Sequence, residues 1–239
     1  KMESVRLDKY LSVALAVSRT DAKTLLKQKC VAINGSVVTK ADVKVVEDDA
    51  VTVRGKSVTY KKNIYLVMNK PKGVLSASSD KRAKTVIDIV PECYKHYELF
   101  TVGRLDKDTT GFVLITDDGD FAHRILSPKN HIMKTYHATL RAPLTNEDIE
   151  HFRKGIELSD GTLCLEAEVR MLPDTEEPTA EVKICEGKYH QVKRMFAALG
   201  NKVLYLKRVK MGELDLDPAL PEGQCREITD DELSLISTK

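Results

Sequence analysis

The chain has 239 residues, and its 38 Lys and Arg almost balance its 36 Asp and Glu, giving a formal net charge of +2. This length suits one large domain, or a small domain joined to a medium one. Hydrophobic residues make up 42% of the chain, yet no apolar run reaches the length of a membrane span and no signal-peptide pattern is present. These properties argue against a membrane-spanning helix, so we expect a globular protein of the cytoplasm with no membrane partner.

Cysteine usage agrees with a reducing compartment. The five cysteines are odd in number, widely scattered and never spaced as Cys-x-x-Cys. Such a set argues against a disulfide framework and against a zinc site.

Charge is unevenly distributed along the chain. Residues 1–62 hold 13 Lys and Arg against 7 Asp and Glu, a net charge of +6, whereas the rest of the chain carries −4. A small basic block is typical of a module that binds polyanions. An ordinary solvated surface would have the same charge, so this pattern alone leaves both interpretations open.

The basic block contains signals for two helices and a hairpin. Leucines at four-residue intervals predict a helix over residues 6–16. Ser18 and Asp21 form a candidate capping box at the start of a second helix. The Asn34-Gly35 pair predicts a tight turn between two short strands over residues 31–38.

Three cations recur on one face of the second predicted helix, at Arg19, Lys23 and Lys27. Like charges at this spacing repel one another unless an anion lies opposite. We therefore predict that this face binds RNA phosphates, although a small helical domain without a ligand would contain the same elements.

From residue 64 the chain alternates short strands and short helices without a regular βαβ rhythm. Apolar and polar residues alternate in one of the predicted strands, where Ala180, Val182 and Ile184 face one way, which favours a half-exposed sheet. Candidate capping boxes at Thr145 and Thr229 predict helices. The predicted class is α+β, with a mixed, mainly antiparallel sheet. The predicted strands are residues 65–68, 112–115, 135–140, 180–185 and 203–209.

Two glycines bracket the most informative segment, Gly103-Arg104-Leu105-Asp106-Lys107-Asp108-Thr109-Thr110-Gly111. Glycines in these places favour a tight loop that presents its side chains at a sheet edge. Arg104 offers a planar fork for a phosphate or a nucleobase, and Asp106 could act as a nucleophile or an acid–base group. Spacing alone does not exclude Asp108 as the nucleophile.

Three further segments place polar side chains where chemistry could use them. Lys70 lies in a Pro-Gly turn after the first strand of the larger domain. Tyr136 lies on a strand, where a lone tyrosine is more often a core residue. A helix predicted over residues 190–199 places His190, Lys193 and Arg194 on one stripe, which can pair with a carboxylate and hold phosphates. Its apolar stripe, expected to be buried, is Val192, Met195, Phe196 and Leu199.

Asp106 to Thr110 also fits the Asp-x-Asp-x-Thr nucleophile loop of haloacid-dehalogenase-type phosphatases. That chemistry needs Mg²⁺ bound by carboxylates, and Asp117, Asp118 and Asp120 lie nearby in the sequence. The loop should, however, follow a buried parallel strand in a doubly wound fold. Residues 98–104 make a poor buried strand and no βαβ series follows, which disfavours this alternative.

The motifs together resemble two families that act on RNA. Residues 4–50, with LDKYL, SRTDAKTLLKQ and VAINGSVV, resemble the S4 RNA-binding domain. The series NKPKG, GRLD, KTY, HQVK and LKRVKMG resembles the motifs of RNA pseudouridine synthases of the RsuA-like branch. The resemblance implies an S4-like RNA-binding domain at residues 1–60 and a pseudouridine synthase catalytic domain at residues 61–239.

The resemblance also implies a role for each motif residue. Asp106 would attack the target uridine, Tyr136 would be the general base over the flipped uracil, and Lys193 would form an ion pair with Asp106. Arg104 would occupy the space that the flipped uridine leaves, and Leu206 would pack under the reactive base. We expect no metal and no other cofactor, because no bond that forms requires one. RNA contacts are predicted at Arg104, Arg194, Arg19, Lys23, Lys27, Lys70, His190 and Arg208.

The stretch EGKYHQVKRM is closer to the small-subunit members of this branch than to the large-subunit members, which carry an Asn-Arg version. We therefore expect the substrate to be one uridine of 16S ribosomal RNA, free or within an assembling small-subunit particle, and the enzyme to be a monomer. A 23S-directed enzyme of the same branch and a catalytically silent RNA-binding protein remain the alternatives.

Overall fold

The computed structural model describes residues 4–237, which divide into two compact units. The first unit runs to Ile64 and includes Glu92–Tyr97, and the second holds Tyr65–Pro91 and the chain from Glu98 onward. Within residues 4–237, none of the helices combines the length and apolar character that crossing a membrane requires.

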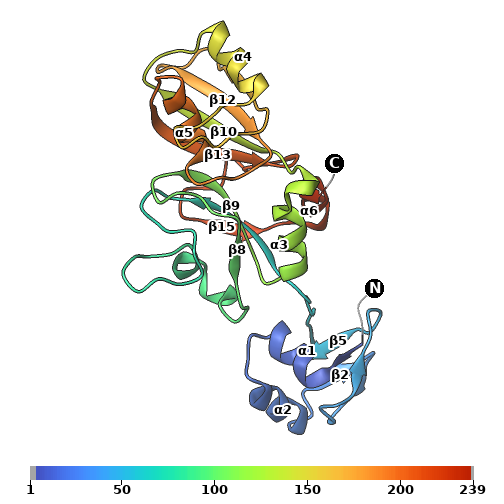
Figure 1. The fold of residues 1–239 in the computed structure, drawn as a ribbon. Helices are drawn as coiled ribbons and strands as arrows, with labels where there is room; N and C mark the ends of the chain where they lie inside the picture. The colour runs from blue at the N-terminus through green and yellow to red at the C-terminus, as the bar shows by residue number, and fades with distance from the viewer. Residues whose placement is uncertain (1–3, 238–239) are drawn as a thin grey trace. The chain divides into compact units, whose positions relative to one another are not determined.

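The first unit contains two helices, α1 (Leu7–Ala14) and α2 (Arg19–Lys27), as the sequence predicts (Figure 1). The capping box at the start of α2 is confirmed. The backbone N–H of Asp21 donates to Ser18 Oγ over 3.1 Å, and the N–H of Ser18 donates to the Asp21 carboxylate over 3.3 Å. The inner faces of the helices pack on the strands through a cluster that includes Leu7, Leu11, Ala22, Leu26, Val31 and Val51.

Short strands complete the first unit. The predicted hairpin is present, and Asn34 and Gly35 both adopt positive φ, 50° and 81°, as a tight turn of this kind requires. Its strands belong to a four-stranded sheet of order β3-β2-β5-β6, while β1 pairs separately with β4. The strands are β1 (Val5–Arg6), β2 (Val31–Ile33), β3 (Ser36–Val37), β4 (Lys44–Val45), β5 (Val51–Val53) and β6 (Lys56–Ser57).

The second unit is built on a nine-stranded sheet with the path β11-β12-β10-β13-β9-β7-β15, to which β8 and β14 add at β9 and β13. Every pairing among its described strands is antiparallel except that of β9 with β13. The predicted α+β class and mixed, mainly antiparallel sheet are confirmed. The strands are β7 (Tyr65–Lys70), β8 (Phe100–Val102), β9 (Thr110–Thr116), β10 (Lys134–Leu140), β11 (Glu168–Met171), β12 (Thr179–Ile184), β13 (Val203–Met211), β14 (Leu214–Asp215) and β15 (Cys225–Glu227).

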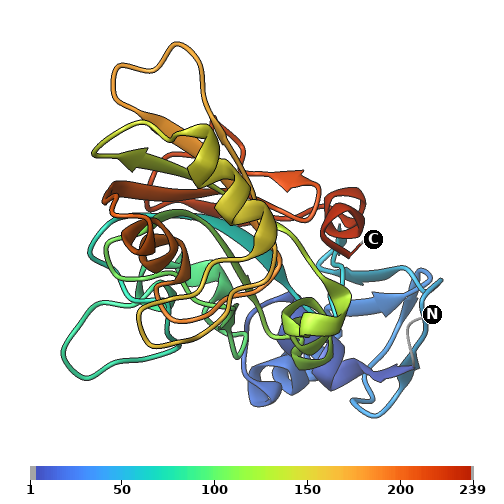
Figure 2. The same ribbon diagram turned by 45° about the horizontal axis from the view of Figure 1, so that its top comes forward.

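Helices cover this sheet. The predicted capping box at Thr145 begins α4, and the rings of Phe152 and Phe196, 5.0 Å apart, join α4 to α5. In the view of Figure 2, α4 lies over the strands of this part of the sheet. The helices are α3 (Gly119–Leu126), α4 (Asn146–Lys154), α5 (Gln191–Ala198) and α6 (Asp230–Ser237), with single 3₁₀ turns at Ile87–Ile89, Glu92–Tyr94 and Pro128–Asn130.

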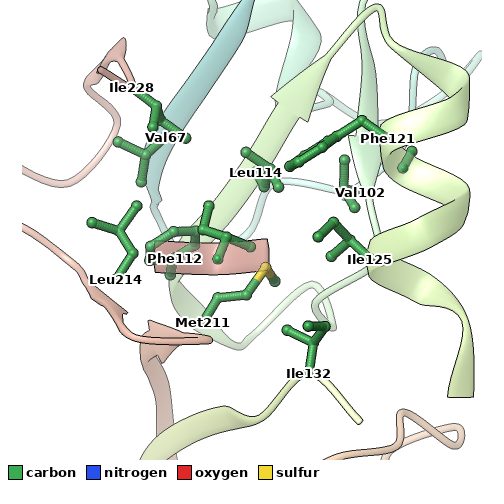
Figure 3. Packing of buried hydrophobic residues seen from close by; sticks show 12 residues of the cluster. Val67, Val102, Phe112, Leu114, Phe121, Ile125, Ile132, Met211, Leu214 and Ile228 are labelled. Carbon is green, nitrogen blue, oxygen red and sulfur yellow. The ribbon is translucent and has the colours of Figure 1, made fainter. Parts of the chain in front are cut away.

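A hydrophobic core fixes β9, the strand that follows the glycine-bracketed segment. Phe112 and Leu114 of β9 pack with Val102 of β8 and with Phe121 and Ile125 of α3 (Figure 3). Burial of each such side chain stabilises the fold by about 1.5–3 kcal/mol. The loop before β9 is therefore attached to a rigid strand inside the sheet.

The parallel pairing of β9 with β13 brings two backbones unusually close. Gly111 lies opposite Arg208 and adopts a φ of 99°. A Cβ atom at position 111 would lie 2.2 Å from the carbonyl oxygen of Arg208, closer than any real contact. The second glycine of the GRLDKDTTG segment is therefore required by this close approach of the strands.

Candidate active site

The glycine-bracketed segment forms the loop between β8 and β9. Gly103 begins it with a φ of 79°. Leu105 points inward and is buried, and its backbone N–H donates to Ser76 Oγ over 3.1 Å. The N–H of Thr109 donates to the carbonyl oxygen of Asp106 over 3.1 Å, which closes a turn around Asp106. The loop thus anchors its apolar residue in the core and presents the side chain of Asp106.

Lys70 supports this loop from inside the protein. Its ammonium group donates to the carbonyl oxygens of Pro71, Lys107 and Thr109 at 3.0, 3.2 and 2.8 Å. Burial lowers the pKa of Lys70 to about 8. The predicted RNA contact at Lys70 is wrong, because a side chain with 0% of its surface exposed does not reach a phosphate.

Lys193 of α5 lies between two carboxylates. Its ammonium nitrogen is 3.1 Å from Asp106 Oδ2 and 2.6 Å from Asp108 Oδ1. Burial opposes the charge on Lys193, but the hydrogen bonds to Asp108 and Asp106 outweigh it and raise the pKa of Lys193. The hydrogen bond from Lys193 also lowers the pKa of Asp108. The two carboxylates differ in exposure, since the Asp106 side chain is 24% exposed and that of Asp108 is 62% exposed.

His190 provides a second contact to Asp106, with Nε2 3.4 Å from Asp106 Oδ1. The helix was expected to begin at His190, but α5 begins at Gln191. His190 instead adopts a left-handed backbone, with φ 49° and ψ 33°, and precedes the helix. Non-glycine residues rarely adopt this conformation, and it is concentrated at functional sites.

Sequence reasoning missed the polar residues that fix the turn before α5. Gln191 is buried, and its side chain donates to Glu186 over 2.7 Å and accepts from the N–H of Lys188 over 2.8 Å. Leu199, which we expected to be buried, is only half-buried at the end of the helix. Gln191, at the first position of α5, was the feature of the sequence from which this hydrogen-bond network could have been predicted.

Arg194 turns away from Asp106. Its guanidinium group lies 2.5 Å from Asp160 and donates to the carbonyl oxygen of Tyr189 over 3.3 Å. The expected stripe of His190, Lys193 and Arg194 is therefore divided, and only its first two members reach Asp106.

Tyr136 on β10 lies opposite Arg208 on β13, and both side chains are buried. Arg208 Nε donates to the carbonyl oxygen of Phe112 over 2.8 Å, and Nη1 makes a long hydrogen bond of 3.5 Å to the Tyr136 hydroxyl. Arg208 Nη2 is buried and has no hydrogen-bond partner among the described residues. With 2% of its surface exposed, Arg208 would reach RNA only from the floor of a cavity.

Two cavities meet at Tyr136. A small one of about 60 Å³ is bordered by Asp106, Tyr136, Leu206 and His190. A larger one of about 740 Å³ is bordered by Tyr136, Arg208 and Lys134. Arg104 is exposed and borders both cavities.

Lys134 is a half-buried cation of the larger cavity that sequence reasoning did not single out. Burial, with Arg208 nearby, lowers the pKa of Lys134 to about 8. Its ammonium group donates to the carbonyl oxygens of Ile132 and Cys185 at 3.2 and 3.4 Å. Its position two residues before Tyr136 in the KTY motif was the available signal.

In the first unit, Arg19, Lys23 and Lys27 all lie on α2 and are exposed, as expected for a phosphate-binding face. Within residues 4–237, no group of three or more His, Cys, Asp or Glu side chains is placed to hold a metal ion.

Comparison with known proteins decides the family. Residues 64–198 match the family model described as RNA pseudouridylate synthase, and residues 5–51 match that of the S4 domain. The chain belongs to the RNA pseudouridylate synthase family. The resemblance seen in its motifs is confirmed, and the protein is an RNA pseudouridine synthase with an S4 domain.

Other RNA pseudouridine synthases match it over almost their whole length. An uncharacterized RNA pseudouridine synthase of Bacillus subtilis, YtzG, is 44% identical over 236 residues, which cover 98% of each chain. The ribosomal small subunit pseudouridine synthase A of Vibrio cholerae is 40% identical over 233 residues, or 97% of this chain and 99% of the relative. A crystal structure of a pseudouridylate synthase, 36% identical, superposes with a TM-score of 0.68 and covers 98% of this chain and 100% of that one.

Proposed function

We propose that this RNA pseudouridine synthase isomerises one uridine of 16S ribosomal RNA, with Asp106 as the nucleophile. The observation that carries the proposal is the 3.1 Å ion pair between Asp106 and Lys193, beside a cavity bordered by Tyr136 and Leu206. The name of the Vibrio cholerae relative, a ribosomal small subunit pseudouridine synthase, supports 16S over 23S RNA.

The target uridine must leave its stack before a protein group can reach it. Arg104 is exposed at the mouth of both cavities and is suited to fill the space that the uridine vacates. The cavity beside Asp106 measures about 60 Å³, well below the roughly 300–1,000 Å³ of ordinary ligand sites. Side chains around Asp106 therefore move when the uracil enters.

Asp106 then attacks the anomeric carbon of the ribose, or promotes a glycal route, and the bond from that carbon to N1 of uracil breaks. The freed uracil turns, and its carbon 5 forms the new bond to the anomeric carbon as the bond from that carbon to Asp106 breaks. On the glycal route, Asp106 instead returns the proton that it took from carbon 2′ of the ribose. Tyr136 removes the proton from carbon 5, N1 gains a proton, and no atom is gained or lost. Lys193 orients the Asp106 carboxylate and balances its charge, and His190 helps to orient it.

Asp108 remains the alternative nucleophile because it shares Lys193 with Asp106. The greater exposure of the Asp108 side chain favours Asp106 as the nucleophile. Among the described residues, Asp106 borders the cavity with Tyr136 whereas Asp108 borders neither cavity. We therefore propose that Asp108 positions Lys193 through their ion pair.

The S4 domain supplies RNA affinity in this proposal. Residues 1–60 bind RNA through the exposed cations of α2, and residues 61–239 carry out catalysis. The enzyme acts as a monomer in the cytoplasm, on ribosomal RNA that is free or within an assembling small-subunit particle. The match of the S4 family model to residues 5–51 supports this division.

The decisive experiment maps pseudouridine by carbodiimide-stop primer extension in EDTA. Wild type, Asp106→Asn and Asp108→Asn are compared on 16S RNA, 23S RNA and small-subunit particles. We expect one stop in 16S RNA that Asp106→Asn abolishes and Asp108→Asn retains. A stop lost only in Asp108→Asn would overturn the assignment of the nucleophile, and a stop only in 23S RNA would overturn the substrate. Binding without any stop would favour a silent RNA-binding protein.

The salt dependence of binding tests the α2 face. Removing one cation that binds a phosphate should reduce the slope of log K against log salt by about 0.7–0.9. Reversing the charge at Arg19, Lys23 and Lys27 together should therefore weaken binding and flatten its salt dependence. An unchanged slope would show that the face does not bind phosphates.

A further inference from the structure

Tyr189 has an exposed aromatic ring beside His190, a neighbour of Asp106. Its side chain is 75% exposed, more than any other large hydrophobic side chain among residues 4–237. Burial in the core does not account for this residue. From its position and stacking geometry we propose that Tyr189 is a stacking platform for an unpaired nucleobase of the RNA, next to the target uridine. The inference rests on the proposed function and adds a binding subsite to it.

The ring of Tyr189 is linked to Asp106, the proposed nucleophile, through His190. Its plane stacks on the imidazole of His190, with ring centroids 3.8 Å apart and an interplanar angle of 17°. His190 in turn lies 3.4 Å from the Asp106 carboxylate. The ring of Tyr189 therefore has one face covered by His190, and its high exposure leaves the other face open for a ligand.

The backbone around Tyr189 is held before RNA arrives. Its carbonyl oxygen accepts from Arg194, and Gln191 bonds to Lys188 through both its backbone N–H and its side chain, at 3.1 and 2.8 Å. A ring that is already ordered loses little conformational freedom on binding. This arrangement is that of a preformed contact surface.

An RNA base is the occupant that the reaction itself supplies. When the target uridine swings toward Asp106, its neighbour in the strand loses a stacking partner. That neighbour is held within one nucleotide of the catalytic cavity, because a single phosphodiester joins it to the target uridine. Aromatic side chains commonly replace lost base stacking in single-stranded RNA. Tyr189 would thus stabilise the flipped state.

The first test uses the 16S RNA fragment around the mapped uridine, with 2-aminopurine placed on its 5′ or its 3′ side. Full-length wild type and Tyr189→Phe should quench the fluorescence at one of these sides, and Tyr189→Ala should not. Tyr189→Ala should also lower kcat/KM by about 5- to 150-fold. Leu204→Ala is the control, since Leu204 is a 55% exposed hydrophobic residue on β13.

The second test removes the base instead of the ring. An abasic site on the quenched side should slow the wild type by the same factor, and Tyr189→Ala should lose nothing further on that RNA. If the losses from the abasic site and from Tyr189→Ala were additive, the inference would be overturned. It would also be overturned if Tyr189→Ala kept full activity and still quenched the fluorescence. If the wild type modifies no RNA, the proposed function fails. Quenching is then measured with an oligouridylate that carries one 2-aminopurine. If the wild type does not quench this fluorescence, the stacking role is overturned as well.

Discussion

The ammonium group of Lys70 donates a 2.8 Å hydrogen bond to the carbonyl oxygen of Thr109, so a buried cation at the end of β7 holds the loop that carries Asp106. The bond spans 39 residues of sequence and leaves no part of Lys70 exposed. The position of Asp106, the proposed nucleophile, therefore depends on a side chain that is itself fully buried.

Replacing Lys70 with Met should slow the enzyme more than it weakens RNA binding. Three carbonyl oxygens lose their hydrogen-bond donor in this variant. We expect the free energy of unfolding to fall by about 1–3 kcal/mol, a loss partly offset because Met, unlike Lys, buries no charge. Displacement of Asp106 should lower kcat at least about tenfold. Urea unfolding and single-turnover kinetics measure both effects. The exposed Lys72→Met variant should match the wild type in stability, and unchanged turnover in Lys70→Met would contradict this role.

Lys193→Met should abolish turnover and spare RNA affinity. The substitution leaves Asp106 and Asp108 without the cation between them, so we expect a loss of at least about 100-fold in kcat. Arg194→Met is the matched control, because Arg194 pairs with Asp160 instead, and its loss should be much smaller. Single-turnover rates and filter-binding affinities measure the two properties. Equal losses in both variants would show that Lys193 acts only as an RNA contact.

Gly111→Ala should destabilise the second unit by at least about 3 kcal/mol. The added Cβ would lie 2.2 Å from the carbonyl oxygen of Arg208, so β9 and β13 must separate. Gly119→Ala is the control, because a Cβ there meets nothing within 4 Å. Urea unfolding of both variants measures the difference, and a Gly111→Ala protein of wild-type stability would refute the close approach of the two strands.

Arg208→Met should lower turnover while changing the stability of the protein only slightly. Arg208 is buried and makes no ion pair with any residue between 4 and 237. Replacing such a charge with an apolar side chain of similar shape should change the free energy of unfolding by only about 1 kcal/mol. Turnover should fall, because Tyr136 loses a hydrogen-bond donor. The double variant with Tyr136→Phe should be no slower than Tyr136→Phe alone, whereas additive losses would place Arg208 elsewhere in the reaction.

Acid should weaken the second unit through Glu232. Its carboxylate accepts two 2.8 Å hydrogen bonds from Arg226, which lower the pKa of Glu232 to about 2. Because the folded pKa lies below the unfolded value of about 4.3, the stabilisation is complete above that pH and is lost as the pH falls toward 2. After solvent screening we expect about 1–2 kcal/mol.

Urea unfolding between about pH 7 and pH 2 measures this dependence on acid. Glu232→Gln should be less stable at pH 7 and should lose less stability on acidification than the wild type. Glu176→Gln, an exposed loop variant, should follow the wild-type curve. Parallel curves for Glu232→Gln and the wild type would argue against this ion pair.

Sequence patterns were sufficient where the interaction is local. The capping boxes at Ser18 and Thr145 join residues three positions apart, and the turn at Asn34-Gly35 depends on two backbone angles. Alternation in β12 likewise follows from one exposed and one buried face, with Ala180, Val182 and Ile184 all buried. Such signals need no knowledge of the rest of the fold.

The candidate site was predictable only in part. Asp106 and Lys193 were paired through a resemblance, and no local pattern connects residues so far apart in the chain. Burial of Lys70 and Arg208 was missed because their partners are carbonyl groups 39 and 96 residues away. The division of the α5 stripe was missed because it follows from the left-handed backbone of His190 and from the position of Asp160.

The order of the strands in the sheet differs from their order in the chain, and this has a consequence for synthesis of the enzyme. β13 lies between β10 and β9 in space, yet it is made after both. A growing chain that stops before Val203 therefore carries Tyr136 and Asp106 on two halves of a sheet that lack the strand between them. The candidate site comes together only when this late strand has been added, so we expect unfinished chains to be inactive.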